Sequence, residues 1–310
     1  MESKPIVSIE NLTKVIKGRT IIDDLSFDVY RGEVFGFLGP NGAGKTTTIR
    51  MIVGLMSITS GDIKIDGFSI QKNFEKAVQS VGAIVENPEM YKFLSGYQNL
   101  QQYARMVGGV SKAKIDEIVD LVGLSERIDD KVKTYSLGMR QRLGLAQCLL
   151  HDPAVLILDE PTNGLDPAGI REIRDYLRFL AKEKNMAVIV SSHILSEMEM
   201  MCDRIGIIQN GKLVDVQQVK EFVQGAAETI VEFEVTPLPQ AISVLGERYP
   251  NLSIQKGERT ITLTIAKELI PDIIKAFVHT DLKVYGVREL TKTLEDRFLE
   301  ITKGDGGKIL

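Results

Sequence analysis

The segment GPNGAGKTT at residues 39–47 constrains the fold of this chain more than any other stretch. It follows the apolar run 34–38 and precedes residues whose apolar side chains recur at helical spacing. Strand, glycine loop and helix in this order, with a lysine and a threonine closing the loop, form the pattern of a phosphate-binding loop. The sequence therefore predicts a binding site for a nucleoside triphosphate at the end of a strand.

The residue types of this loop suit the chemistry of phosphate. Its glycines let backbone N–H groups point inward with no Cβ in the way, and the following helix adds the positive end of its dipole. Lys45 is expected to reach the β- and γ-phosphates of ATP, and the Thr46 hydroxyl is expected to bind Mg²⁺. The alternative, a glycine-rich turn that matches by accident, is disfavoured by the flanking strand and helix. The predicted nucleotide-binding residues of the loop are Gly39, Pro40, Asn41, Gly42, Ala43, Gly44, Lys45, Thr46 and Thr47.

Length and composition predict a cytoplasmic globular protein. The chain has 310 residues, 44% of them hydrophobic, which is enough for one large domain and a smaller one. No apolar run approaches the ~18 residues that a membrane helix requires, and the amino terminus lacks the apolar core of a signal peptide. We therefore expect that the chain cannot form a pore by itself.

Charge and cysteine content argue against several classes of partner and site. The net charge is −4 with both signs interspersed, so the chain lacks the basic face of a nucleic-acid-binding protein, and binding to a membrane surface by charge alone is equally unsupported. The two cysteines, Cys148 and Cys202, each lie in an apolar segment. This favours buried free thiols over a disulfide framework or a zinc site.

The apolar pattern before the middle of the chain is that of strands. Alternation predicts strands over much of residues 5–38 and again at 61–67 and 81–85. We expect the last two to join the same layer of sheet as the strand that precedes the phosphate loop.

The pattern then changes to helical spacing and back. Residues 88–150 predict a helical insertion, with Ser111 as an N-cap within it. Two short runs that are apolar at every position, 155–158 and 187–190, predict buried parallel strands. The helical pattern at 169–184 predicts the crossover helix between them.

A second, smaller domain is predicted at residues 228–302. The order strand, helix, strand, strand, helix, strand indicates an α+β domain of ferredoxin-like type. A terminal helix is expected to carry Leu294, Phe298 and Ile301, and the tail 303–310 is expected to be disordered.

Two acids close the first of the buried runs, in the sequence VLILDEP. Ligands of parallel sheets collect at the carboxyl ends of the strands, where Asp159 and Glu160 are expected to lie. Asp159 fits a carboxylate that binds Mg²⁺ directly or through water, and Glu160 fits the base that polarises an attacking water. A helix N-cap is the alternative use of such a pair.

Three later motifs complete a resemblance to a known family. They are TYSLGMRQR at 134–142, LDP at 165–167 and SSHILSE at 191–197. With the phosphate loop and the acidic pair, they make the chain resemble the ATP-binding subunits of ATP-binding cassette (ABC) transporters over residues 5–225. The resemblance implies an α/β fold of the P-loop NTPase type: a mixed sheet core, an antiparallel β-subdomain and a helical subdomain at about 88–150.

The resemblance also implies a head-to-tail dimer, in which ATP on one phosphate loop is closed over by a second cassette. Ser136 and the Gly138 backbone are then expected to touch the γ-phosphate in trans. His193 is expected to contact the γ-phosphate and to steady the water set up by Glu160, and Asp166 to carry the signal across the dimer. From the residues alone, Asp166 also fits a turn and helix cap, and His193 also fits a hydrogen-bonded structural residue.

Three positions depart from the commonest pattern of the family. The aromatic residue that usually stacks on adenine should fall near Ile16, and neither Val15 nor Ile16 offers a π-face, so we expect loose base selectivity. Glu86 stands where a glutamine is usual. As a carboxylate it can bind Mg²⁺ or water but cannot donate a hydrogen bond. The signature segment has Leu137 for a glycine and Met139 for a glutamine.

These substitutions, together with the small domain and its segment LEDRFLEIT, resemble one subgroup of the family. It comprises bacterial exporters of bacitracin, lantibiotics and related peptide or polyene antibiotics, whose membrane partner is a separate polypeptide. The resemblance implies an ATPase that powers export through a permease of about six spans, and a chain held at the inner face of the membrane. The candidate dock for the permease is the apolar set Met90, Tyr91, Phe93, Leu94 and Tyr97, whose alternative role is packing within the helical insertion.

Two other classes of function remain open on sequence. A soluble cassette ATPase acting on DNA, ribosomes or iron–sulfur assembly is one, although the chain lacks the long coiled-coil insertion or second cassette expected of the first two. A regulatory module that binds ATP without hydrolysing it is the other, and the presence of Lys45, Asp159, Glu160 and His193 disfavours it.

Overall fold

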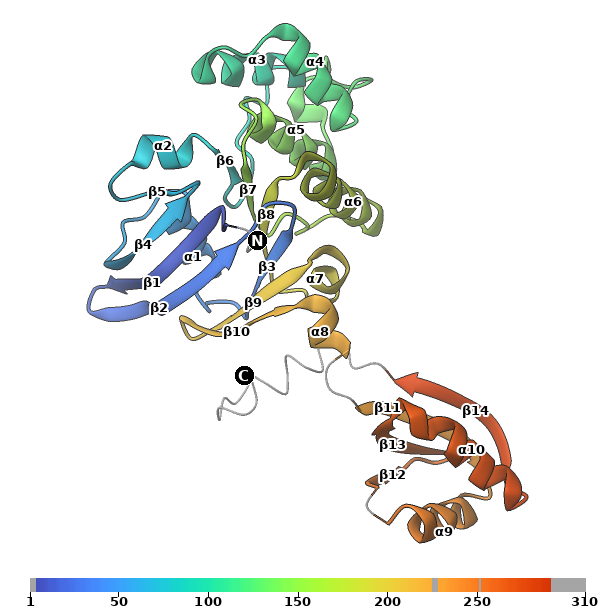
Figure 1. Cartoon of the computed structure of the whole chain (residues 1–310). Coiled ribbons are helices and arrows are strands. Elements are labelled where there is room, and N and C mark those ends of the chain that lie inside the picture. The colour runs from blue at the N-terminus through green and yellow to red at the C-terminus, as the bar shows by residue number, and fades with distance from the viewer. Residues whose placement is uncertain (1–3, 225–227, 251, 291–310) are drawn as a thin grey trace. The chain divides into compact units, whose positions relative to one another are not determined.

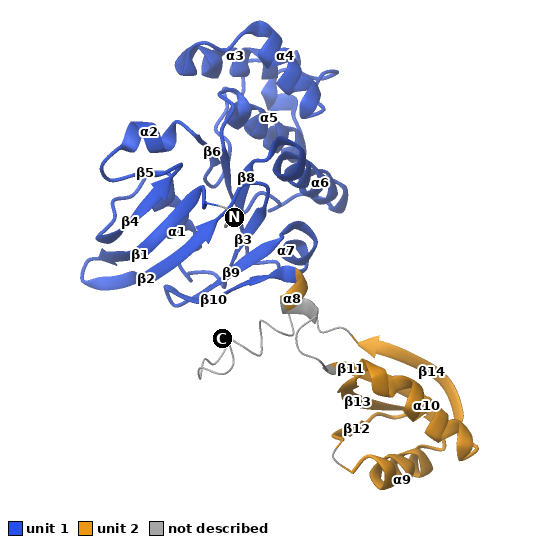
Figure 2. Ribbon diagram, in the orientation of Figure 1, with its two compact units in different colours: residues 1–219 blue, residues 220–310 orange. Residues whose placement is uncertain are grey.

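The computed structural model describes residues 4–224, 228–250 and 252–290 (Figure 1). Residue contacts divide the chain into two compact units, 1–219 and 220–310 (Figure 2). Within the described ranges, no helix is long and apolar enough to cross a membrane.

The first unit contains a four-stranded antiparallel sheet in the order β2-β1-β4-β5. β1 (Val7–Ile16) pairs with β2 (Arg19–Val29) on one side and with β4 (Ser60–Ile65) on the other. The short β5 (Phe68–Ser69) extends the sheet beyond β4. Val7, Ile9 and Leu12 of β1 are buried, as an amphipathic strand with one face on the core requires.

The core of this unit is a second sheet of six strands in the order β10-β9-β3-β8-β7-β6. Its strands are β3 (Val34–Leu38), β6 (Val81–Ile84), β7 (Val155–Asp159), β8 (Ala187–Ser192), β9 (Arg204–Gln209) and β10 (Lys212–Gln218). All neighbours pair in parallel except the edge strand β10, which is antiparallel to β9. Every residue of β3, β7 and β8 is buried and β7 pairs in parallel with β8, so the prediction of buried parallel strands at 155–158 and 187–190 is confirmed.

One strand expectation is wrong. The segments 61–67 and 81–85 were expected in one layer with the strand before the phosphate loop, but β4 belongs to the antiparallel sheet and only β6 joins β3. The alternation of β4 and the short run of β6 both fit a strand. Neither pattern specifies the partner, because pairing depends on residues far away in the sequence.

Three helices, α1 (Lys45–Ile52), α6 (Pro167–Lys184) and α7 (Leu195–Met201), pack against strands of the core sheet. The helix after the phosphate loop, α1, contributes Ile49, Met51 and Ile52 to a core cluster that also includes residues of both sheets. α6 and α7 each contact β3 and β8. The short helix α2 (Phe74–Val78) also belongs to the first unit. The helix α8 (Val219–Gln224) begins at the last residue of the first unit and continues into the second.

The predicted helical insertion is present as α3 (Gly96–Val107), α4 (Lys112–Leu121), the 3₁₀ turn η1 (Val132–Thr134) and α5 (Leu137–Leu149). The predicted cap is confirmed, because the Ser111 side chain accepts a hydrogen bond from the Lys114 N–H at 3.1 Å. α5 packs against both α3 and α4 and also contacts β6, which joins the insertion to the core sheet.

The second unit has the predicted order of elements and an all-antiparallel sheet, β12-β13-β11-β14. Numbered within the unit, its strands run 4-1-3-2 across the sheet, which is the ferredoxin-like arrangement. Phe233 and Phe277 meet edge to face at 5.8 Å in its core. The elements are β11 (Glu228–Thr236), α9 (Leu238–Arg248), β12 (Ile254–Lys256), β13 (Thr260–Ala266), η2 (Lys267–Leu269), α10 (Ile270–His279) and β14 (Lys283–Leu290).

Some predictions fall outside the described residues. The expected terminal helix with Leu294, Phe298 and Ile301, the segment LEDRFLEIT and the tail 303–310 are among them. The two cysteines, in contrast, are described, and both are buried free thiols as predicted.

Candidate functional site

The predicted site residues of the core sheet lie at the ends of four adjacent strands. The phosphate loop, 39–47, follows β3, and His193 follows its neighbour β8. Asp159 ends the next strand, β7, with Glu160 directly after it, and Glu86 comes two residues after β6. Because these strands are parallel, their carboxyl ends share one edge of the sheet, and residues far apart in the sequence meet there.

The glycines of the phosphate loop are required for two different reasons. Gly42 and Gly44 have φ angles of 80° and 112°, a left-handed backbone that side chains rarely tolerate. At Gly39, an added Cβ would lie only 2.4 Å from the carbonyl oxygen of Ile208, so close packing against β9 requires glycine there. The prediction attributed all three to inward-pointing N–H groups.

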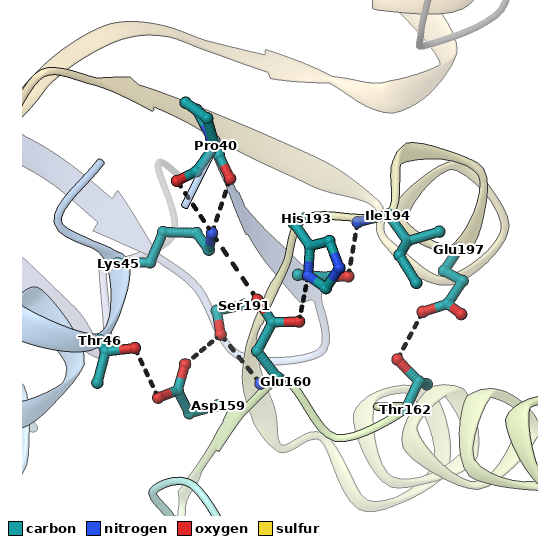
Figure 3. A network of polar contacts seen from close by, with 12 residues as sticks. Pro40, Lys45, Thr46, Asp159, Glu160, Thr162, Ser191, His193, Ile194 and Glu197 are labelled. Atoms are coloured by element: carbon teal, nitrogen blue, oxygen red, sulfur yellow. Dashed lines mark hydrogen bonds and ion pairs between the residues drawn. The ribbon is translucent and has the colours of Figure 1, made fainter. Parts of the chain in front are cut away.

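Lys45 connects the phosphate loop to Glu160 in the polar network (Figure 3). Its side chain is 6% exposed, and Nζ donates a hydrogen bond to the Gly39 carbonyl at 2.7 Å. Nζ also lies 3.7 Å from Glu160 Oε1. Burial lowers the pKa of Lys45, and the charges of Glu160 and Asp159 oppose that shift. The network thus holds a buried cation where the loop is expected to receive phosphate.

Thr46 and Asp159, the two loop and strand residues expected to bind Mg²⁺, are in direct contact. The Thr46 hydroxyl donates to Asp159 Oδ2 at 2.9 Å, and the other carboxylate oxygen, Oδ1, accepts from the Ser191 hydroxyl at 2.5 Å. Asp159 is 3% exposed. A hydroxyl and a carboxylate beside a phosphate loop are hard oxygen donors, the set that Mg²⁺ prefers, so these residues fit that ion.

Glu160 and His193 form the next contact of the network (Figure 3). His193 Nδ1 lies 2.8 Å from Glu160 Oε2. Glu160 has a φ of 52°, in the left-handed region, and its N–H donates to Ser191. The chain turns away from the direction of β7 at this residue. The Glu160 carboxylate lies between Lys45 and His193.

Of these residues, Lys45, Thr46, Glu160 and His193 line a pocket of about 370 Å³ at the phosphate loop. Two residues that sequence reasoning missed, Ile21 and Asn163, also line it. The position of Asn163, three residues after Glu160, could have indicated that it lies near the site. No feature of the sequence indicated Ile21, which lies on β2. Ile16, near which an adenine-stacking aromatic was sought, is 38% exposed at the end of β1.

Besides Gly39, Ala43 and Asp159, which belong to the loop or to the network described above, four predicted residues lie outside this pocket lining. Ser136 is exposed and caps α5, where it accepts from the Met139 N–H at 3.2 Å, and Gly138 follows in the first turn. Asp166 caps α6 through the Gly169 N–H at 2.8 Å, so within one chain it plays the capping role that was the alternative interpretation.

Glu86 is the fourth, and it is paired with a residue of another element. It is exposed and forms an ion pair with Arg50 of α1, the helix that begins with the phosphate loop lysine. No feature of the sequence indicated Arg50 as its partner.

Sequence reasoning also missed the hydroxyl groups that support the site. Ser191 and Ser192 are fully buried at the end of an otherwise apolar strand. Two serines in that position of the sequence could have indicated hydroxyl groups within the site. Further on, the Thr162 hydroxyl donates to Glu197 Oε2 at 2.5 Å in a second buried pair (Figure 3). This contact joins the loop after Glu160 to α7, the helix after His193.

Comparison with known proteins agrees with this geometry. A family model described as ABC transporter matches residues 22–163. The chain is 63% identical over 299 residues to an uncharacterized ABC transporter ATP-binding protein, YhcH, of Bacillus subtilis, with 96% of each chain covered. It is 39% identical over 301 residues to the bacitracin transport ATP-binding protein BcrA of Bacillus licheniformis, covering 96% of this chain and 98% of BcrA.

The fold also matches that of solved ATP-binding subunits. A structure described as the ATP binding subunit of an ABC transporter superposes with a TM-score of 0.63 and 29% identity, covering 70% of this chain and 91% of that one. Family and fold therefore agree with the resemblance seen in the sequence motifs. The chain belongs to the ABC transporter family, as one of its ATP-hydrolysing, ATP-binding subunits.

Proposed function

We propose that this chain powers the export of an antimicrobial peptide, an antibiotic or a similar amphiphile through a separate membrane permease of about six spans. The observation that carries the proposal is the similarity to the bacitracin transport protein, which extends over both units instead of the cassette alone. Relatives named for transport at this coverage favour this function over a soluble ATPase of DNA, ribosomes or iron–sulfur assembly. We assign residues 5–225 to the cassette and 228–302 to an accessory domain.

In the proposed mechanism, the phosphate loop holds ATP and the acidic pair performs the chemistry. Lys45 neutralises charge on the β- and γ-phosphates, and Thr46 and Asp159 would hold Mg²⁺, which neutralises charge that develops on the transferred phosphoryl group. Glu160 accepts a proton from the attacking water. His193, 2.8 Å from Glu160, keeps that carboxylate in place and contacts the γ-phosphate.

A second cassette completes the site in this proposal. Ser136 and Gly138 begin α5, and the exposure of Ser136 supports a role toward another chain. The N-terminal end of α5 would place its dipole against the γ-phosphate of the partner's ATP. Asp166, at the start of α6, would lie at the same interface and report its closure. We expect a homodimer, so an isolated monomer binds ATP but hydrolyses it poorly.

The dock for the permease is proposed at the entrance to the helical insertion. Of the five candidate residues, Phe93 and Tyr91 are 68% and 47% exposed, and their rings meet at 5.8 Å. Met90, Leu94 and Tyr97 are half-buried, as the packing alternative expects. We therefore centre the dock on Tyr91 and Phe93. Attachment there would hold the chain at the inner face of the membrane.

A sensitivity assay tests the proposed function. Cells that lack this chain should become more sensitive to bacitracin, to a lantibiotic or to a polyene, and the intact chain should restore resistance. The Glu160→Gln variant should fail to restore it, because export needs hydrolysis. A tagged chain purified from membranes should bring a multispan protein with it. Unchanged sensitivity to all three compounds, with no such protein recovered, would contradict the proposal.

A further inference from the structure

We propose that Ser191 positions the two carboxylates of the site relative to each other. The inference rests on the proposed roles of Asp159 in metal binding and of Glu160 as the base. Ser191 is the fifth residue of β8, and it is fully buried. In the parallel register of β7 and β8 it lies opposite Asp159. Its hydroxyl is therefore shielded from water and faces the acidic pair.

This hydroxyl contacts both acidic residues at once (Figure 3). It donates to Asp159 Oδ1 at 2.5 Å and accepts from the Glu160 N–H at 3.1 Å. A serine hydroxyl has one hydrogen to donate and two lone pairs, so a single group can make both bonds. The carbonyl of Ser191 also accepts from the Glu160 N–H, at 3.2 Å.

The first bond fixes the orientation of the Asp159 carboxylate. Oδ1 is held by Ser191 and Oδ2 by Thr46, so the carboxylate cannot rotate without losing a hydrogen bond in a buried place. A carboxylate has about four lone-pair sites, which leaves room for a metal ion beside these two bonds. Hydrogen bonds of this kind to a metal-binding carboxylate are a general means of orienting it.

The second bond fixes the peptide that aims Glu160. At a φ of 52°, Glu160 has a backbone conformation that is unfavourable for a residue with a side chain. The hydroxyl and carbonyl of Ser191 both accept from its N–H, and so hold this turn in place. The carboxylate of Glu160 then lies beside Lys45 and His193 instead of continuing along the strand.

The neighbouring serine has a different task. Ser192 is equally buried, but its hydroxyl accepts from the Ile194 N–H at 3.0 Å and so supports the turn that carries His193. Side chains alternate along a strand, so adjacent serines cannot serve the same contact. Ser191 is thus the residue of this pair that is bonded to the acids.

The test compares two variants of the full-length chain that have the same shape. Ser191→Thr keeps the hydroxyl, whereas Ser191→Val replaces it with a methyl group, and both are β-branched residues suited to a strand. The measurements are kcat and KM for ATP, the Mg²⁺ concentration at half-maximal rate, and binding of trinitrophenyl-ATP without metal.

We expect the threonine variant to keep kcat within about threefold and the valine variant to lose about 10- to 100-fold. The Mg²⁺ concentration for half-maximal rate should rise about tenfold in the valine variant only. Metal-free binding of trinitrophenyl-ATP should stay within about twofold in both, because the phosphate loop is unchanged. If threonine and valine behave alike in kcat and in Mg²⁺ requirement, the positioning role is wrong.

Ser191→Ala serves if valine prevents folding, since alanine is smaller and also lacks the hydroxyl. Ser69→Ala is the matched control: Ser69 is buried in the other sheet, donates to the Asp62 carboxylate at 2.8 Å and accepts from the Lys72 N–H at 3.3 Å. It should leave kcat and the Mg²⁺ requirement unchanged.

Glu160→Gln in the same assay separates this inference from the function on which it rests. Normal turnover by Glu160→Gln would overturn the assignment of the base, and the Ser191 inference with it. An inactive Glu160→Gln beside a fully active Ser191→Val would overturn the Ser191 inference alone.

Discussion

His193 Nδ1 and Glu160 Oε2 lie 2.8 Å apart at the carboxyl ends of two neighbouring strands, β8 and β7. The pair forms within a single chain, beside the lysine of the phosphate loop. The exposed Ser136, in contrast, caps α5 outside the pocket lining. One chain therefore contains the residues expected to activate water, and we expect a second chain to supply the segment that closes over ATP.

Replacing the proposed base tests the assignment of Glu160. Glu160→Gln keeps the shape of the side chain but cannot accept the proton of the attacking water, so phosphate release should fall by about 10²- to 10⁴-fold. ATP should still bind, and size-exclusion chromatography with ATP should show a stable dimer. Glu172→Gln is the control, because the Glu172 side chain is 60% exposed on α6. Full turnover by Glu160→Gln would refute the assignment.

The ion pair between Arg50 and Glu86 makes a second prediction. If Glu86 leaves Arg50 to bind Mg²⁺ during turnover, Arg50→Gln should lower the Mg²⁺ concentration for half-maximal ATPase rate, and Glu86→Gln should raise it. The effects should stay within about fivefold, because the two side chains are 38% and 62% exposed and such pairs are weak. Shifts in the same direction in both variants would show that Glu86 does not bind the ion.

A charged residue in the proposed dock should separate hydrolysis from export. Phe93→Asp places a charge on a side chain that is 68% exposed, so the fold and the ATPase rate of the purified chain should be retained. Resistance and recovery of the permease should be lost. Leu55→Asp is the matched control, because Leu55 is 70% exposed in another part of the cassette. Unfolding of Phe93→Asp, or its full activity in export, would argue against the dock.

The buried thiols predict how stability depends on pH. Burial raises the pKa of Cys148 to about 12 from its ordinary value of 9.0, and burial also raises the pKa of Cys202. A raised pKa means that the folded chain keeps protons that the unfolded chain releases above pH 9. The free energy of unfolding should therefore fall with rising pH above 9, by about 1.4 kcal/mol per pH unit for each thiol.

Chemical denaturation at pH 8 and pH 10 measures this dependence. Cys148→Ala should reduce the loss between the two values by the share of one thiol, about 1.4 kcal/mol. An equal loss in the variant and the intact chain would mean that Cys148 does not cause it.

Local patterns predicted much of this fold, since their physical causes are local. The phosphate loop follows from glycine and helix chemistry within 39–47, and the fully apolar runs of β7 and β8 follow from burial on both faces. Asp159, Glu160 and His193 could be placed together because parallel strands end at one edge.

What the sequence could not predict depends on pairing between distant segments. The alternation in β4 indicated a strand but not its sheet, and the bond from Ser191 to Asp159 depends on the register of β8 against β7. The pairing of Glu86 with Arg50 depends on how the end of β6 lies relative to α1. In each case, the contact is set by packing of the whole unit and leaves no local trace.

β8 has hydrogen-bonded neighbours on both sides, β3 on one and β7 on the other. The phosphate loop, His193 and Glu160 thus follow three neighbouring strands of one hydrogen-bonded sheet. The rigid backbone of the sheet sets the distances among these three groups. The distances therefore do not have to be restored by movements of long side chains in every cycle. We therefore expect the conformational changes of the cycle to occur outside this sheet, while the residues that perform hydrolysis keep their relative positions.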